Sequence, residues 1–130
     1  MKEQVPRVLL VDDSDLFRAM LRVYLKDLPL VVLEAGDGDV ALQLLESTQV
    51  ALVVADLNMA RVGGLELLAA MRAHGSQTVR RAAFVLITAE EQNSPHFESA
   101  RKASVDGFVT KPVRPKVFRE LVQQLLLQRA

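Results

Sequence analysis

The sequence contains no cysteine, and only two histidines, His74 and His96, stand far apart in it. Without cysteine the chain can form no disulfide framework, no thiol nucleophile and no thiolate metal site. Two scattered histidines are too few for a histidine-rich metal site. These absences exclude thiol catalysis and the common zinc centres.

The chain also carries no net charge, because its 16 basic and 16 acidic side chains balance one another. This balance gives no sign of a surface for nucleic acid or for an anionic membrane. The first residues, MKEQVPR, lack the apolar segment of a signal peptide, and no apolar run approaches the roughly 20 residues that span a bilayer. We therefore expect a soluble, cytoplasmic protein that binds neither nucleic acid nor membranes.

The apolar residues are arranged for a single core. Half of the 130 residues are apolar, which favours one domain over residues 1–130. Five short segments rich in Val, Leu, Ile and Phe have the nearly continuous apolar character of parallel strands covered on both faces. These segments are Arg7–Val11, Val31–Ala35, Val50–Ala55, Ala82–Thr88 and Gly107–Thr110.

Apolar residues recur at helical spacing between and after the expected strands. The repeats are Leu16, Ala19, Met20, Val23 and Tyr24; Val40, Ala41, Leu44 and Leu45; Leu65, Leu68, Ala69 and Met71; Phe97, Ala100 and Ala103; and Val117, Phe118, Leu121, Val122 and Leu125. Ser14 is the expected N-cap of the first helix, Pro29 is expected to end its pattern, and the polar run His74–Arg81 is expected to be a loop. The alternation predicts an α/β fold, with an open, doubly wound parallel sheet between two layers of helices.

Polar side chains follow four of the five expected strands. Asp12 and Asp13 follow the first strand, Asp56 the third, Thr88 ends the fourth and Lys111 follows the fifth. Ligands of open parallel sheets bind outside the carboxyl ends of the strands. We therefore expect three carboxylates, a hydroxyl and an ammonium around one pocket.

This set of groups favours phosphoryl transfer. Three neighbouring carboxylates repel one another, and the repulsion raises the pKa of at least one of them or demands a cation. Mg²⁺ is suitable because it prefers oxygen ligands, keeps some of its waters and bridges to phosphate. Lys111 can pair with a carboxylate at rest and with a phosphoryl oxygen later, while Thr88 offers a neutral donor. Positioning and charge neutralisation of this kind suit in-line transfer to a carboxylate nucleophile.

The motifs at these strand ends occur together in one known family. They are Val8–Ser14 (VLLVDDS), Asp56–Met59 (DLNM) with Gly64 after it, Thr88–Ala89, and Phe108 three residues before Lys111–Pro112. Across essentially the whole chain, the sequence resembles the response-regulator receiver domain of two-component signalling. The resemblance implies a flavodoxin-like (βα)₅ fold with strand order 2-1-3-4-5, and a phosphoprotein that serves as the phosphoacceptor of a phosphorelay.

The resemblance also implies a role for each acidic position. Asp56 would accept the phosphoryl group. Asp13 and Asp56 would bind Mg²⁺ directly, together with the backbone carbonyl of Asn58, and Asp12 would act largely through a water. The family commonly has proline where this chain has Ala60, a departure that removes no functional group.

The remaining site residues would hold and transmit the phosphoryl signal. Thr88 and Lys111 would bind phosphoryl oxygens, and Thr88 would act with Phe108 as the switch pair. We also expect a cis peptide bond at Lys111–Pro112, since the cis form is accessible before proline.

The resemblance further implies two kinds of partner. The donor would be a histidine kinase or a phosphotransfer protein. Signal output would go to a downstream protein, or to a second copy of the chain, through the face formed by the fourth helix, fifth strand and fifth helix. The chain would not be an enzyme toward other substrates, and would catalyse only its own phosphorylation and dephosphorylation.

Two alternatives use the same strand ends differently. A Mg²⁺-dependent phosphatase of the haloacid-dehalogenase type also forms an aspartyl phosphate. It needs a second aspartate two residues after the nucleophile, where this chain has Asn58, and generally extra length for a cap. A flavodoxin-like cofactor binder disagrees with the acidic pocket, which would repel a flavin phosphate.

Overall fold

The computed structural model describes residues 5–59, 61–89, 95, 98 and 105–128. Five strands form one sheet in the order β2-β1-β3-β4-β5, and each neighbouring pair is parallel. The strands are β1 Arg7–Val11, β2 Val31–Ala35, β3 Leu52–Asp56, β4 Ala83–Thr88 and β5 Gly107–Thr110. This topology confirms the flavodoxin-like, doubly wound fold with strand order 2-1-3-4-5.

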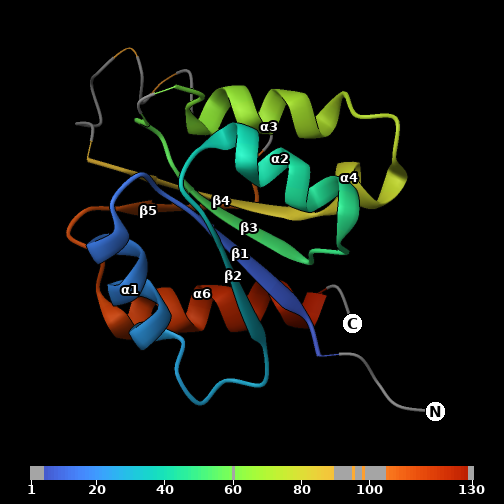
Figure 1. Ribbon diagram of the computed structural model, residues 1–130. Coiled ribbons are helices and arrows are strands. Elements are labelled where there is room, and N and C mark those ends of the chain that lie inside the picture. Colours follow the sequence, from blue (N-terminus) through green and yellow to red (C-terminus); the bar gives the residue numbers. More distant parts are fainter. Residues whose placement is uncertain (1–4, 60, 90–94, 96–97, 99–104, 129–130) are drawn as a thin grey trace.

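Helices cover both faces of the sheet (Figure 1). The helices are α1 Asp15–Tyr24 and α6 Pro115–Gln128 on one face, and α2 Gly38–Ser47, α3 Gly64–Arg72 and α4 Gln77–Arg81 on the other. No helix in the described part of the chain is long and apolar enough to cross a membrane. The predicted helix through Phe97, Ala100 and Ala103 lies outside the described residues, as does Ala60.

Alternate residues of each central strand face two separate cores. In β1, Val8 and Leu10 pack with α1 and α6, whereas Leu9 and Val11 pack with α2 and α3. All four side chains are buried. Burial on both faces explains why the strand reads as a continuous apolar run.

The first helix begins as predicted but ends earlier. The Ser14 hydroxyl accepts a hydrogen bond from the backbone N–H of Phe17 at 3.1 Å, so Ser14 is the N-cap. The helix ends at Tyr24, and Asp27 then takes a left-handed backbone conformation with φ of 70°. The prediction that Pro29 ends the helix is therefore wrong, because the chain has turned before reaching it.

The first helix meets the sheet with only part of the apolar stripe read in the sequence, because Met20 and Tyr24 pack against the core as predicted. Leu16 and Val23 are 82% and 66% exposed, whereas Leu21 is buried and Phe17 packs beside it. Two apolar stripes overlap on this helix, and spacing alone does not tell which of them faces the core.

The run His74–Arg81, predicted as a loop, contains the short helix α4. Val79 is buried against the core, and the Arg72 guanidinium donates to the carbonyls of Arg80 and Ala82 at 2.8 Å each. One apolar residue in a polar run gives no periodicity. Tertiary contacts with α3 stabilise this single turn instead.

Candidate functional site

The carboxyl ends of β1, β3, β4 and β5 meet at one edge of the sheet (Figure 1). Asp12 follows β1, Asp56 is the last residue of β3 and Thr88 is the last residue of β4. These are the only buried polar or charged residues within the described ranges, with exposures of 3%, 5% and 0%. Burial of polar groups is unfavourable unless they are paired, so three such residues at one edge of the sheet indicate a functional site.

Asp56 and Lys111 form the central contact of the site. Lys111 Nζ lies 2.7 Å from Asp56 Oδ2, and the backbone N–H of Asn58 donates to Asp56 Oδ1 at 2.9 Å. The ammonium also lies 4.5 Å from the centre of the Phe17 ring, a favourable cation–π distance. The Lys111–Pro112 peptide bond is cis, as predicted.

Asp12 supplies a second buried carboxylate beside Asp56. Its Oδ1 accepts the backbone N–H of Ser14 at 2.8 Å, whereas its Oδ2 is buried and has no hydrogen-bond partner among the residues that the structure describes. Burial raises the pKa of Asp12 to about 6; the neighbouring Asp56 carboxylate acts in the same direction, while the Ser14 N–H and Lys111 act against it. An unpartnered buried carboxylate oxygen next to a second carboxylate is a place for a cation or a water.

The predicted metal ligands are only partly brought together. Asp13 is exposed. Among the residues that the structure describes, no three Asp, Glu, His or Cys side chains form a group that could hold a metal ion. The pair Asp12 and Asp56, with its unpartnered oxygen, nevertheless fits Mg²⁺, which often binds through one or two carboxylates and retained waters.

A glycine allows α3 to start directly against the end of β3. A Cβ atom added at Gly64 would lie 2.6 Å from the carbonyl oxygen of Asp56 and 2.7 Å from Leu86 Cδ1. The Gly64 N–H donates to the Leu57 carbonyl at 3.2 Å. This close approach fixes the loop that carries Asp56 and Asn58.

The expected switch residues lie on neighbouring strands. Thr88 is completely buried at the end of β4, and its carbonyl accepts the backbone N–H of Lys111 at 2.9 Å. Phe108, opposite Leu86 in the ladder, is half-buried and packs against the core beneath α2 and α3. The structure thus brings Thr88 to the site, and sets Phe108 further back in β5.

Sequence reasoning missed two residues of α1 that reach the site. The Phe17 ring contacts the Lys111 ammonium, and the Arg18 guanidinium donates to the carbonyl oxygen of Asp12. The available signal was their position in the first turn of the helix that follows Asp12 and Asp13.

Comparisons with known proteins agree with the fold. The family model of the response regulator receiver domain matches residues 8–123. The chemotaxis protein CheY of Pseudomonas aeruginosa is 32% identical over 120 residues, which cover 92% of this chain and 94% of that protein. The regulator of RpoS of Escherichia coli is 32% identical over 117 residues, which cover 89% of this chain but 33% of that protein. The crystal structure of chemotaxis protein CheY4 of Vibrio cholerae matches with a TM-score of 0.81 and 28% identity, covering 94% of this chain and 99% of that one. The chain therefore belongs to the response regulator receiver domain family of two-component signalling.

Proposed function

We propose that this chain is a phosphoacceptor signalling module that takes a phosphoryl group onto Asp56 with the help of Mg²⁺. One observation carries the proposal. The buried Asp56 carboxylate is held by the Lys111 ammonium at 2.7 Å, beside Asp12 Oδ2, which is buried and has no hydrogen-bond partner in the described part of the chain. A nucleophilic carboxylate, a neighbouring ammonium and a second acidic oxygen that can face a metal ion are the groups that phosphoryl transfer to a carboxylate uses.

The chemistry follows from these groups. One oxygen of Asp56 would attack the phosphorus of a phosphohistidine in line, forming a P–O bond as the P–N bond breaks. The electron pair of the broken bond stays on the imidazole nitrogen, which takes up a proton. Lys111 would then leave the carboxylate for a phosphoryl oxygen, and the Thr88 hydroxyl would hold another.

The metal would be held by the end of β3 and by Asp12–Ser14 between β1 and α1, which we call the acidic loop. Asp13 and Asp56 would bind Mg²⁺ with the backbone carbonyl of Asn58, and Asp12 would act through a water. When bound, the ion neutralises the charge of the phosphoryl oxygens. Ca²⁺ should support the reaction poorly, because it is larger and takes more ligands in an irregular arrangement.

The surface beside the site favours a protein as the donor. Leu16 of α1 is largely exposed, and the next residue, Phe17, contacts Lys111. Exposed apolar side chains bordering a reactive group fit a protein surface better than a small polar donor. We propose a cytoplasmic histidine kinase or phosphotransfer protein as the donor. The output partner, a downstream protein or a second copy of the chain, would bind the face formed by β5, α6 and the fourth helix that the sequence predicts.

Treatment with acetyl phosphate tests the proposal. The parent protein should gain one phosphoryl group by mass spectrometry in Mg²⁺ and none in excess chelator. Asp56→Asn should gain none, whereas Asp27→Asn, an exposed change in the turn after α1, should behave like the parent. Labelling of Asp56→Asn, or undiminished labelling in chelator, would contradict the site or the metal.

The same protein should not be a phosphatase. The family model and the relatives described above give no support to the haloacid-dehalogenase alternative. We propose that the chain catalyses only its own phosphorylation and dephosphorylation. Incubation with a generic phosphomonoester should therefore release no more than stoichiometric phosphate, and many turnovers would favour the phosphatase.

A further inference from the structure

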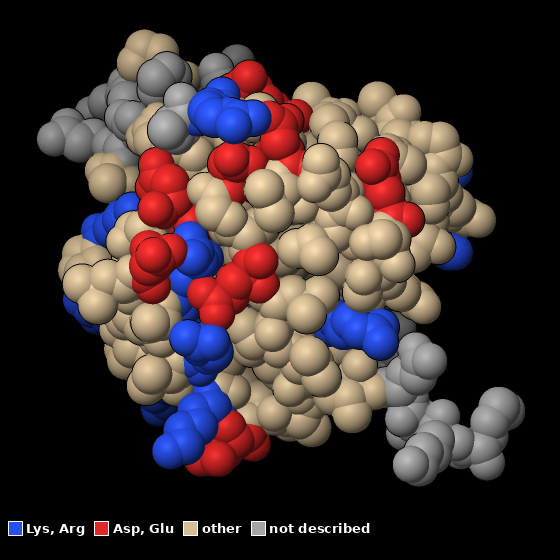
Figure 2. Space-filling view, in the orientation of Figure 1, with Lys and Arg blue, Asp and Glu red and all other residues tan. Residues whose placement is uncertain are grey.

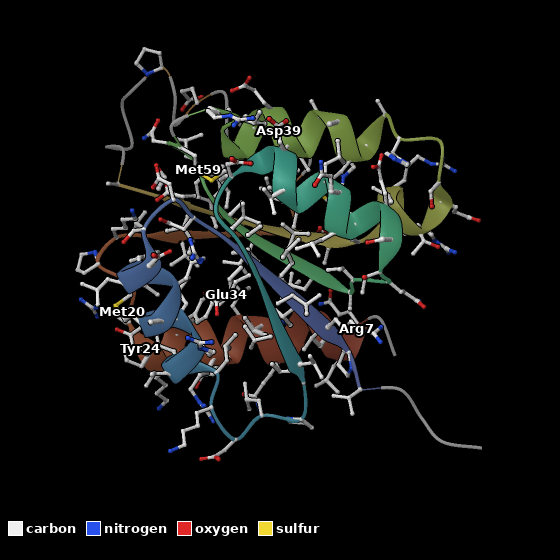
Figure 3. All side chains as sticks on the ribbon, viewed as in Figure 1. Arg7, Met20, Tyr24, Glu34, Asp39 and Met59 are labelled. Carbon is white, nitrogen blue, oxygen red and sulfur yellow. The ribbon has the colours of Figure 1, made fainter. Side chains whose placement is uncertain are left out.

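Arg18 joins three elements around the acidic loop. Its side chain is only 13% exposed. Its Nη1 donates to the carbonyl oxygen of Asp12, its Nε donates to Glu34 Oε1 at 3.0 Å, and its Nη2 pairs with Asp15. Glu34 lies on β2, on the side of the sheet that faces α1 (Figure 3). One guanidinium thus connects the end of β1, the start of α1 and the neighbouring strand.

The contact with Arg18 completes the hydrogen bonds of Asp12 at its N–H, its carbonyl oxygen and Oδ1. The Asp12 N–H donates to the Ala35 carbonyl at 3.1 Å, and Oδ1 accepts the Ser14 N–H at 2.8 Å. Arg18 takes the Asp12 carbonyl. Within the described ranges, Oδ2 is the Asp12 oxygen left without a hydrogen-bond partner, and it is buried near Asp56. The contacts of Asp12 therefore fix the residue and leave one acidic oxygen for a ligand.

We propose that Arg18 is a positioning residue that preorganises the acidic loop for Mg²⁺, an inference that rests on the proposed function of the site. The carbonyl of Asp12 and the N–H of Asp13 belong to the same peptide plane, so holding this carbonyl sets the direction in which Asp13 leaves the strand. The planar guanidinium reaches acceptors on three sides, which a lysine ammonium cannot do from the same position. Groups that orient metal ligands typically change metal affinity by about 10- to 100-fold.

Arg22 offers a matched control one helical turn further along α1. Its Nη1 lies 2.7 Å from Glu34 Oε2, so it shares a partner with Arg18, but its side chain is 57% exposed and lies further from the site. Basic and acidic side chains alternate over α1 and β2 on the left of the molecule, in agreement with these ion pairs (Figure 2). Replacing either arginine by lysine keeps the positive charge, so a difference between the two variants reports geometry rather than net charge.

Calorimetric titration with MgCl₂ tests the inference at constant pH and ionic strength. Arg18→Lys should weaken Mg²⁺ binding by about tenfold or more. Arg22→Lys should bind within about twofold of the parent, because exposed ion pairs contribute little. Parent-like affinity in Arg18→Lys, or equal losses in both variants, would overturn the inference while leaving the proposed function intact. A parent protein that binds no Mg²⁺ would overturn both.

A measurement without metal separates positioning from a general loss of stability. The Ser14 N–H is bonded to Asp12 Oδ1, so its hydrogen exchange in chelator reports the order of the loop. Exchange at Ser14 should be faster in Arg18→Lys than in Arg22→Lys when each variant is measured at the same interval below its own melting temperature. If Arg18→Lys does not fold, Glu34→Gln is measured in its place. This change weakens the contact that holds the Arg18 guanidinium on β2 and leaves Arg18 itself unchanged. Unchanged Mg²⁺ affinity and unchanged Ser14 exchange in Glu34→Gln would then overturn the inference.

Discussion

Lys111 Nζ lies 2.7 Å from Asp56 Oδ2, although the two residues are 55 positions apart in the sequence. The sheet makes this contact possible, because β4 lies between β3 and β5 and the Lys111 N–H is tied to the carbonyl of Thr88. The lysine thus balances the charge of a carboxylate that is only 5% exposed. A phosphoryl group on Asp56 would compete for this ammonium, so the contact is a resting state of the proposed chemistry.

Replacing Lys111 with methionine should destabilise the metal-free protein. Asp56 would keep the Asn58 N–H but lose its counterion, and an unpaired buried carboxylate is unfavourable. The Lys111 side chain is 33% exposed, so solvent screening limits the expected loss to about 1 kcal/mol. Urea unfolding in chelator measures it. Lys116→Met, on the exposed side of α6, is the control, and an equal loss there would show that the effect is not specific to the pair.

Replacing Asp12 with asparagine should stabilise the metal-free protein at neutral pH. The pKa of Asp12 is raised by burial from its ordinary value of 3.8 to about 6 in the folded chain. Protonated Asp12 therefore contributes stability that is fully present below pH 3.8 and is lost as the pH rises through about 6. The variant should gain up to about 3 kcal/mol over the parent at pH 7, and close to nothing at pH 3.5.

Urea unfolding of both proteins across this pH range, in chelator, checks the sign. Asp13→Asn changes an exposed carboxylate of the same loop and should give a smaller gain. A gain for Asp12→Asn that is the same at acidic and neutral pH would contradict the raised pKa. Added Mg²⁺ should reverse the order, because it stabilises the parent by binding the ionised site.

Replacing Gly64 with alanine should damage both the fold and the site. The added Cβ would meet the Asp56 carbonyl at 2.6 Å, and backbone cannot move aside as a side chain tip can. We expect a loss of about 1–3 kcal/mol in urea unfolding, and slower labelling by acetyl phosphate. Gly75→Ala is the control, because among the described residues no heavy atom beyond its chain neighbours lies within 4 Å of its added Cβ. A similar loss at Gly75 would mean that close approach is not the cause.

The sequence predicted the strands better than it predicted the contacts of the helices. Continuous apolar runs gave the bounds of β1, β2 and β5 and came within two residues of the others, because strands buried on both faces leave a signal in every residue. The core-facing stripe of α1 was predicted only in part, since Met20 and Tyr24 pack against the core, whereas Leu16 and Val23 have the right spacing but lie in solvent.

Among the site residues, those at strand ends could likewise be predicted from the sequence, and those that reach the site from a helix could not. Asp56, Asp12 and Lys111 could be predicted because each stands at the end of an apolar run, and the topology then brings the strand ends together. Arg18 could not, because its role depends on the Asp12 carbonyl and on Glu34 of β2. Those contacts arise only once α1 has packed across β1 and β2.

The last prediction concerns how the phosphoryl group would be read out through Thr88. This residue is fully buried at the end of β4, next in the sheet to the strand that carries Phe108. Phosphorylation would add negative charge and strong acceptors beside the Thr88 hydroxyl, which should move toward them and leave space for Phe108 to turn inward. The partner would then bind the phosphorylated form more tightly, by the difference of its affinities for the two states.

A single tryptophan can report this movement, because the chain has none of its own. In Phe108→Trp, the phosphoryl mimic beryllofluoride with Mg²⁺ should shift the emission as the ring becomes buried. Adding Thr88→Ala should abolish most of the shift while phosphorylation from acetyl phosphate falls less, because the hydroxyl transmits the signal more than it binds the phosphoryl group. Thr88→Ser keeps the hydroxyl and should restore the shift. An equal shift in the alanine and serine variants would mean that Thr88 does not couple the site to Phe108, and the switch would have to run through another residue while Asp56 remained the acceptor.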